Sequence, residues 1–133
     1  MNDLSEILNL LKKVRRLFAD DEKRWIKYTM AIDGRFMSCD PQSKDAKCWC
    51  LSGGLRKYGK TTTEGFIKGS LVQDACRELD QVIFKAFPDR IDQLRILSPV
   101  PQFNDHSLTR FDDVIYVITT ACNNVKQRIR KNV

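Results

Sequence analysis

The chain has 133 residues, of which 42% are hydrophobic and 30% are charged, and its formal net charge is +6. A chain of this length forms one domain with its own core, so residues 1–133 are expected to fold as a single compact unit. No apolar run approaches the ~18 residues that a membrane span needs, and no signal peptide is visible, so we expect a cytoplasmic protein. The positive charge permits an acidic partner but does not require one.

Helical spacing of apolar residues, together with N-cap residues, predicts five helices along the chain. These are residues 4–19, 20–27, 47–58, 71–87 and 107–128. Pro99 and Pro101 exclude helix from residues 98–101, because proline disfavours helix both before and within itself. The expected fold is mainly α, with about five helices around one core.

A small β-hairpin is expected on the flank of this core. Asp33-Gly34 separates two strand-like segments, residues 28–32 and 35–37. Asp-Gly at such a position is a strong signal for a type I′ turn, whose two central residues both need positive φ. A two-stranded ribbon is not stable alone, so it must pack against the helices.

The stretch Cys48-Trp49-Cys50-Leu51-Ser52-Gly53-Gly54-Leu55 is the most unusual part of the sequence. With a helix starting near Lys47, Cys50 falls in the first turn, where the helix dipole lowers a thiol pKa and attracts anions. The paired glycines suggest that another backbone or a ligand approaches closely. Three interpretations stay open: two core thiols, a reactive Cys50, or a ligand-binding site without covalent chemistry. Burial outweighs a dipole in magnitude, so we predict an inert thiol.

Other site chemistries find less support. The five cysteines are irregularly spaced, and Cys48-x-Cys50 lacks the spacer of a zinc knuckle, so neither a disulfide framework nor a metal site is expected. Glycine-rich phosphate loops are absent from the sequence, and no cofactor is expected. A cysteine hydrolase or transferase would use Cys50 with His106 and Asp105, although Asn104 and Asp105 before a helix are also explained as caps.

Basic residues form two clusters, one near the end of the first helix and one at the end of the last. They are Lys12, Lys13, Arg15 and Arg16, and Lys126, Arg128, Arg130 and Lys131. Such clusters are more often solvated helix faces than nucleic-acid footprints. A nucleic-acid-binding protein would need both clusters on one face, and the 17 interspersed acidic residues predict only weak binding.

The spacing of Trp25, Asp33-Gly34, Trp49-Cys50-x-x-Gly53-x-Leu55 and Asn104-Asp105 resembles an uncharacterised family of small proteins from bacteria and their phages, a domain of unknown function. The resemblance covers most of the chain. The family usually has Ala in place of Gly54. The resemblance implies a phage or prophage accessory context and no established activity.

The leading hypothesis is a binding module in the cytoplasm of the host cell. It would be phage- or prophage-encoded, would bind a host protein or an anionic small ligand such as a nucleotide, and would serve to counter bacterial defence. Two converging helix starts would form a backbone anion site. Its residues would be Trp49, Cys50, Ser52, Gly53, Asn104 and Asp105. The alternatives are the cysteine enzyme built on Cys50 and His106, and the basic nucleic-acid-binding protein.

Overall fold

The computed structural model of the chain describes residues 3–59, 70–94 and 98–132. Its elements, in chain order, are α1 (Leu4–Phe18), η1 (Glu22–Arg24), β1 (Ala31–Asp33), β2 (Ala46–Trp49), α2 (Leu51–Gly59), α3 (Leu71–Ala86), η2 (Pro88–Arg90), α4 (Pro99–Asp105) and α5 (Phe111–Lys131). The prediction of a mainly α fold with a small antiparallel β-hairpin is confirmed.

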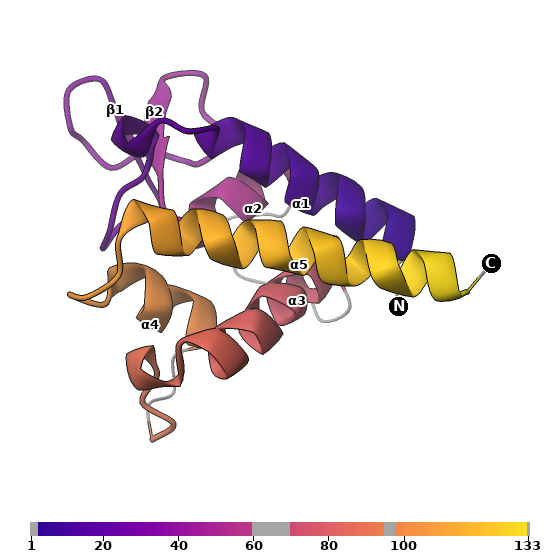
Figure 1. Ribbon diagram of the computed structural model, residues 1–133. Coiled ribbons are helices and arrows are strands. Elements are labelled where there is room, and N and C mark those ends of the chain that lie inside the picture. The colour runs from indigo at the N-terminus through magenta and orange to yellow at the C-terminus, as the bar shows by residue number, and fades with distance from the viewer. Residues whose placement is uncertain (1–2, 60–69, 95–97, 133) are drawn as a thin grey trace.

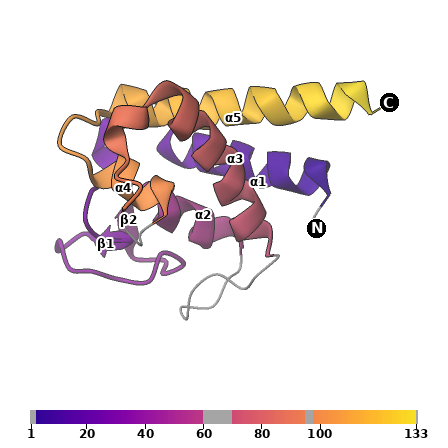
Figure 2. The same ribbon diagram turned by 90° about the horizontal axis from the view of Figure 1, so that it is seen from below.

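The core lies between α1 and the long helix α5, which run antiparallel and side by side (Figures 1 and 2). Apolar residues at helical spacing give each helix one buried face, and these two faces pack together. Helix α3 packs against both, and α2 and α4 close the remaining sides. The Asp3 carboxylate caps α1 by accepting the Ser5 N–H, and the Ser70 hydroxyl caps α3 by accepting the Gln73 N–H. Both of these helix starts follow the sequence prediction.

The hairpin has a different second strand from the predicted one. Strand β1 pairs with β2 in the register Ala31↔Trp49 and Ile32↔Cys48, so the start of the predicted helix over residues 47–58 is a strand instead. Segment 35–37 contributes no strand, and only Ser38 forms an isolated bridge with Ile32. A four-residue apolar-polar pattern is too short for the two periods to be told apart, which explains the error.

The turn at Asp33-Gly34 exists, but it is not a type I′ turn. The Asp33 carboxylate accepts the N–H groups of Arg35 and Met37 at 2.8 and 3.1 Å and so holds the turn from within. Gly34 does not adopt the left-handed region, which is taken by Phe36 instead, at a φ of 62°. The left-handed backbone conformation of the turn therefore falls on Phe36 and not on Gly34.

The prolines that were predicted to exclude helix in fact begin α4. Ser98 is its N-cap, and Pro99 stands in the first turn, where a backbone N–H has no partner inside the helix. The predicted last helix begins later than expected, at Phe111, and ends later, at Lys131. Asn104 and Asp105 consequently lie at the C-terminal end of α4 and not at the start of the following helix.

Candidate functional site

Cys50 is the residue at which strand β2 becomes helix α2. Its carbonyl accepts the Gly54 N–H at 2.9 Å, and its thiol sulfur accepts the Gly53 N–H at 3.2 Å, as an N-cap side chain does. Cys50 therefore precedes the helix instead of lying in its first turn, which corrects the predicted start near Lys47.

Burial dominates the chemistry of this thiol. The Cys50 side chain is buried, and this burial raises its pKa to about 11, against the opposing hydrogen bond from Gly53. The nearby Asp105 carboxylate raises the pKa further. The direction agrees with the predicted inert thiol, because a nucleophilic cysteine needs a lowered pKa.

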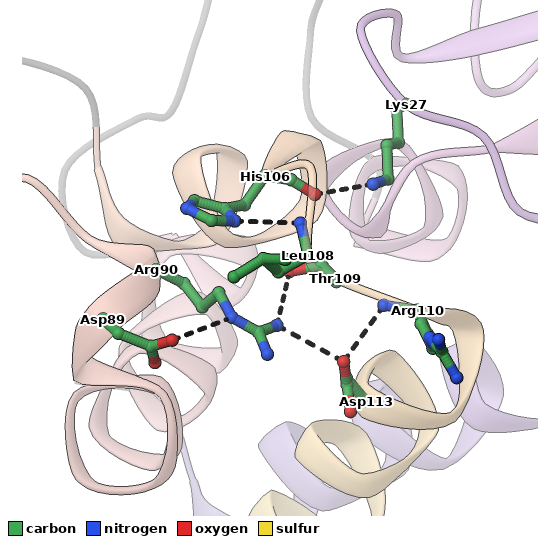
Figure 3. A network of polar contacts seen from close by, with 8 residues as sticks. All are labelled: Lys27, Asp89, Arg90, His106, Leu108, Thr109, Arg110 and Asp113. Atoms are coloured by element: carbon green, nitrogen blue, oxygen red, sulfur yellow. Dashed lines mark hydrogen bonds and ion pairs between the residues drawn. The ribbon is translucent and has the colours of Figure 1, made fainter.

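The residues of the alternative cysteine enzyme are not assembled. Within the described ranges, the Cys50 sulfur contacts the Gly53 N–H and, at 3.9 Å, the Met30 sulfur. The His106 Nδ1 instead accepts the Leu108 N–H at 3.1 Å (Figure 3). No hydrogen bond in this part of the chain joins the imidazole to the thiol, so the structure offers no support for a catalytic dyad.

Asn104 joins three segments of the chain in the interior. It is 1% exposed. Its Oδ1 accepts the Trp25 indole N–H at 2.7 Å and the Leu51 N–H at 3.0 Å. Its Nδ2 donates to the Ile26 carbonyl at 3.1 Å and to the Asp105 carboxylate at 2.9 Å. An amide forms four such bonds at most, so Asn104 has none left for a ligand.

The two helix starts predicted to converge on an anion site are not both present, because Asn104 and Asp105 end a helix and do not begin one. Asp105 is at the C-terminal end of α4, where the helix dipole is negative, and its Oδ1 accepts the Tyr28 N–H at 2.8 Å. The Leu51 N–H at the start of α2 is already bonded to Asn104. The Leu51 N–H is thus bonded to the protein itself, and the Asp105 carboxylate would repel an anion.

Trp49, Ser52 and Gly53 are also buried, so they belong to the junction between sheet and helix. The Trp49 indole N–H donates to the Pro41 carbonyl at 3.0 Å. A methyl group on Gly53 would stand 1.9 Å from the Met30 carbonyl oxygen. The glycine is explained by close approach of another backbone, one of the two reasons that the sequence suggested.

An open cleft of about 400 Å³ lies beside this junction and includes Asp105 and His106. Arg90 forms its inner wall, with a side chain that is largely buried and donates to Thr109 at 2.9 Å and Asp113 at 3.3 Å (Figure 3). Lys27 donates to the His106 carbonyl at 2.6 Å. The Arg90 bonds tie η2 to the start of α5, and they give the cationic group of the cleft lining structural partners.

A second hollow, the α1–α5 groove, has a different chemistry. It has a volume of about 560 Å³ and is lined by Asn9, Lys12, Arg15, Arg16, Thr119, Cys122, Asn123 and Lys126. Four of these residues are cationic, and none of these lining residues is acidic. Each wall is a row of polar residues at helical spacing, and this spacing is visible in the sequence. It would have indicated the groove if the pairing of α1 with α5 had been known.

The cations of the groove are largely uncompensated. Arg15 donates to the Thr119 hydroxyl at 3.3 Å and pairs with the exposed Asp20 at 3.3 Å, a contact that solvent weakens. Within the described residues, the ammonium groups of Lys12 and Lys126 have no ion-pair partner. Burial raises the pKa of the Cys122 thiol, and the charges of Lys126, Lys12 and Arg15 oppose that rise, so all three act on one atom of the groove.

The two basic clusters of the sequence are therefore divided by the fold. Lys13 faces another hollow, which it shares with Glu6, and Arg128 forms a bidentate ion pair with Glu78 of α3 at 2.6 and 2.9 Å. Only Lys12, Arg15 and Arg16 of the first cluster and Lys126 of the second line the same groove. In the described ranges no cluster of three metal-ligating side chains is present, and no helix is both long and apolar enough to cross a membrane.

The fold and this groove define a small α-rich domain with a concentrated cationic surface between its first and last helices. The chain belongs to the family of unknown function DUF6197, whose model matches residues 3–124. This match includes α1, the hairpin and most of α5, and every lining residue of the groove except Lys126. No curated protein and no solved structure matches the chain.

Proposed function

We propose that this protein is a binding module that holds an anionic ligand in the α1–α5 groove. The observation that carries the proposal is the set of four cations from two helices around one open hollow whose other lining residues are neutral. Gathering like charges costs free energy unless an anion offsets it. The hollow is also within the size range of ligand pockets in proteins.

The proposal keeps the leading hypothesis of an anion-binding module and moves its site. The residues first considered, around Cys50 and Asn104, are buried and bonded to one another. The cysteine-enzyme alternative has no assembled dyad to support it. The groove, in contrast, presents ammonium groups that are free to bind.

Isothermal titration calorimetry with inorganic triphosphate tests the proposal. The double variant Lys12→Ala/Lys126→Ala should weaken binding at least about 100-fold, since each of the two charge-assisted contacts is worth roughly 1.5–3 kcal/mol. Lys13→Ala/Lys131→Ala is the matched control, because it removes the same net charge outside the lining of the groove. Its affinity should stay within about threefold of the native value. Equal losses in both variants, or no binding by the native protein, would refute the proposal.

We also propose an accessory role in a phage or prophage, in which capture of an anionic signal would counter a bacterial defence system. The sequence resemblance to phage and bacterial proteins supports this role. The genomic neighbourhood of the gene tests it directly. Flanking phage genes would agree with the proposal, and a conserved setting among housekeeping genes would contradict it.

A further inference from the structure

We infer that the groove recognises a chain of phosphate groups through their charge and oxygen atoms, without reading a base. The inference rests on the proposed function, because it names the ligand class of the same site. It follows from three features of the described lining residues: the absence of aromatic side chains, the spacing of the cations along the groove, and the neutral amide and hydroxyl groups between them.

The walls hold no aromatic side chain among their described lining residues, and Cys122 is the one apolar group there. Proteins that bind a nucleobase or a single-stranded base usually stack it on an aromatic ring or an apolar surface. A nucleotide in this groove would find partners for its phosphates and none for its base. The lining therefore favours a ligand whose recognised part is phosphate alone.

The cations are spread along the groove instead of converging on one point. The α1 cations, from Lys12 to Arg16, cover five residues, or about 6 Å at the rise of an α-helix, and Lys126 of α5 extends the array. Helix α5 runs antiparallel to α1 (Figure 2). Because Thr119 is bonded to Arg15, Lys126, about two turns further along α5, lies towards the Asn9 end of α1. Arg130 follows Lys126 by one further turn on the same face of α5. An array of this length suits successive phosphates better than a single one.

The neutral lining residues complete the chemistry. Asn9 and Asn123 are exposed amides on opposite walls, and Thr119 adds a hydroxyl. Amide and hydroxyl groups commonly donate to phosphate oxygens, where they fix the position of a backbone without carrying sequence information. The same set of donors serves a nucleic-acid backbone and inorganic polyphosphate, which share the chain of phosphates.

The first experiment separates phosphate from base. The native protein is titrated with ATP and with inorganic triphosphate, and then with oligo-dT, oligo-dA and an abasic strand of equal length. We expect ATP to match triphosphate, and all three strands to match each other, within about threefold. A tenfold preference for ATP over triphosphate, or for one base composition, would overturn the inference. Either result leaves the proposed function standing, because an anion still binds in each case.

The second experiment measures how many phosphates the groove contacts. With four cations engaged, the logarithm of the affinity for a single strand should fall with the logarithm of the salt concentration with a slope of about −2.8. Lys12→Ala and Lys126→Ala should each reduce the slope by about 0.7, whereas Asn123→Ala should weaken binding and leave the slope unchanged. A slope that changes equally in Lys13→Ala would overturn the inference, since Lys13 lies outside the groove.

Inorganic polyphosphate and the abasic strand, compared at equal numbers of phosphates, identify the source. Tighter binding of either one supports a phosphate-chain site and selects its physiological form. A single phosphate that binds as tightly as both chains would refute the inference. If no anion binds, the proposed function itself fails, so the two failures are distinguishable. Circular dichroism of each variant confirms that it is folded.

Discussion

At the scale of single residues, the buried Asn104 side chain is a polar group around which several segments of the chain are held together. It connects the segment after η1, the start of α2 and the end of α4 through side-chain hydrogen bonds. Buried polar networks of this kind are stabilising when every member is satisfied and costly when one is removed. The sequence drew attention to Asn104, but it could not show that Trp25 and the Leu51 N–H, far away in the chain, were its partners.

The first prediction concerns this amide. Asn104→Ala should lower the free energy of unfolding by about 3 kcal/mol, because it leaves the Trp25 indole and the buried Leu51 N–H without acceptors. Urea unfolding followed by tryptophan fluorescence measures the loss. Asn124→Ala, at an exposed site of α5, is the control and should change the stability by less than about 0.5 kcal/mol. Similar effects in both variants would show that the network contributes nothing.

The second prediction concerns the order in which the thiols react. Burial raises the pKa of Cys50 to about 11 and that of Cys76 to about 12, while Cys39 and Cys48 are only half-buried. Iodoacetamide at pH 8 should therefore label Cys39 and Cys48 first, and Cys50 only on unfolding, as read from peptide masses. Fast labelling of Cys50 below pH 7 that is lost in His106→Ala would contradict this order and revive the cysteine enzyme.

At the scale of elements, the paired glycines of α2 have different reasons to be glycine. Gly53 faces the Met30 backbone, while a methyl group on Gly54 would meet the side chains of Val14 and Phe18 at 3.3 and 3.4 Å. A backbone carbonyl fixed by the hairpin cannot yield, whereas side chains can shift by a few tenths of an ångström.

The third prediction follows from that contrast. Gly53→Ala should destabilise the fold by about 3 kcal/mol or more, because the helix must move away from the hairpin. Gly54→Ala should stay within about 1 kcal/mol of the native stability, since its gain in helix propensity offsets a tight contact. Thermal unfolding of the two variants side by side checks the prediction. Equal melting temperatures would mean that the approach of Met30 to α2 is not as close as described.

Asp80 gives the fourth prediction, which concerns pH. This α3 carboxylate is bonded to the Val100 N–H in the first turn of α4, while its Oδ1 is buried without a hydrogen-bond partner. Burial raises its pKa to about 6, against the hydrogen bond from Val100 and the charge of Arg77. The protonated form is thus favoured in the folded state. Its stabilising effect is complete below about pH 4 and is lost as the pH rises through about 6.

Asp80→Asn should therefore be more stable than the native protein at pH 7 and equally stable near pH 4. The difference at pH 7 should be about 1 kcal/mol, after a discount for the partial exposure of the group. A stability difference that is the same at pH 4 and pH 7 would exclude ionisation of Asp80 as its cause.

The sequence was a good guide to elements that local signals determine. Helices α1 and α3 follow from apolar spacing and from the caps Asp3 and Ser70, which act within a few residues. Strand β2 and helix α4 could not be found this way. The first depends on pairing with Ala31–Asp33, and the second on a proline-tolerant first turn and the Asp80 contact. The groove was hidden for a related reason, because it exists only where α1 and α5 meet.

At the scale of the whole molecule, some cations are placed where they would bind an anion, and others are placed where they stabilise the fold. The chain carries a net charge of +6, and part of that excess is gathered in the α1–α5 groove without acidic lining residues. Other cations of the same helices are placed to stabilise the fold, as in the ion pair of Arg128 with Glu78. Repelling charges that stay close together in the free protein lower its stability, and binding sites typically carry such a cost because the function needs the charges there.

The last prediction measures this cost without any ligand. Two unit charges about 10 Å apart in water repel by roughly 0.4 kcal/mol, so removing one of four neighbours should relieve about 1 kcal/mol at low ionic strength. Lys126→Met, which keeps much of the side-chain volume, should therefore raise the melting temperature in 10 mM salt. The gain should shrink at 0.5 M salt, where the Debye length falls well below 10 Å. Lys13 shares its hollow with Glu6, so Lys13→Met should not raise the melting temperature at either salt concentration. If both variants respond alike, the effect reflects net charge alone, and the groove is not a site of stored repulsion.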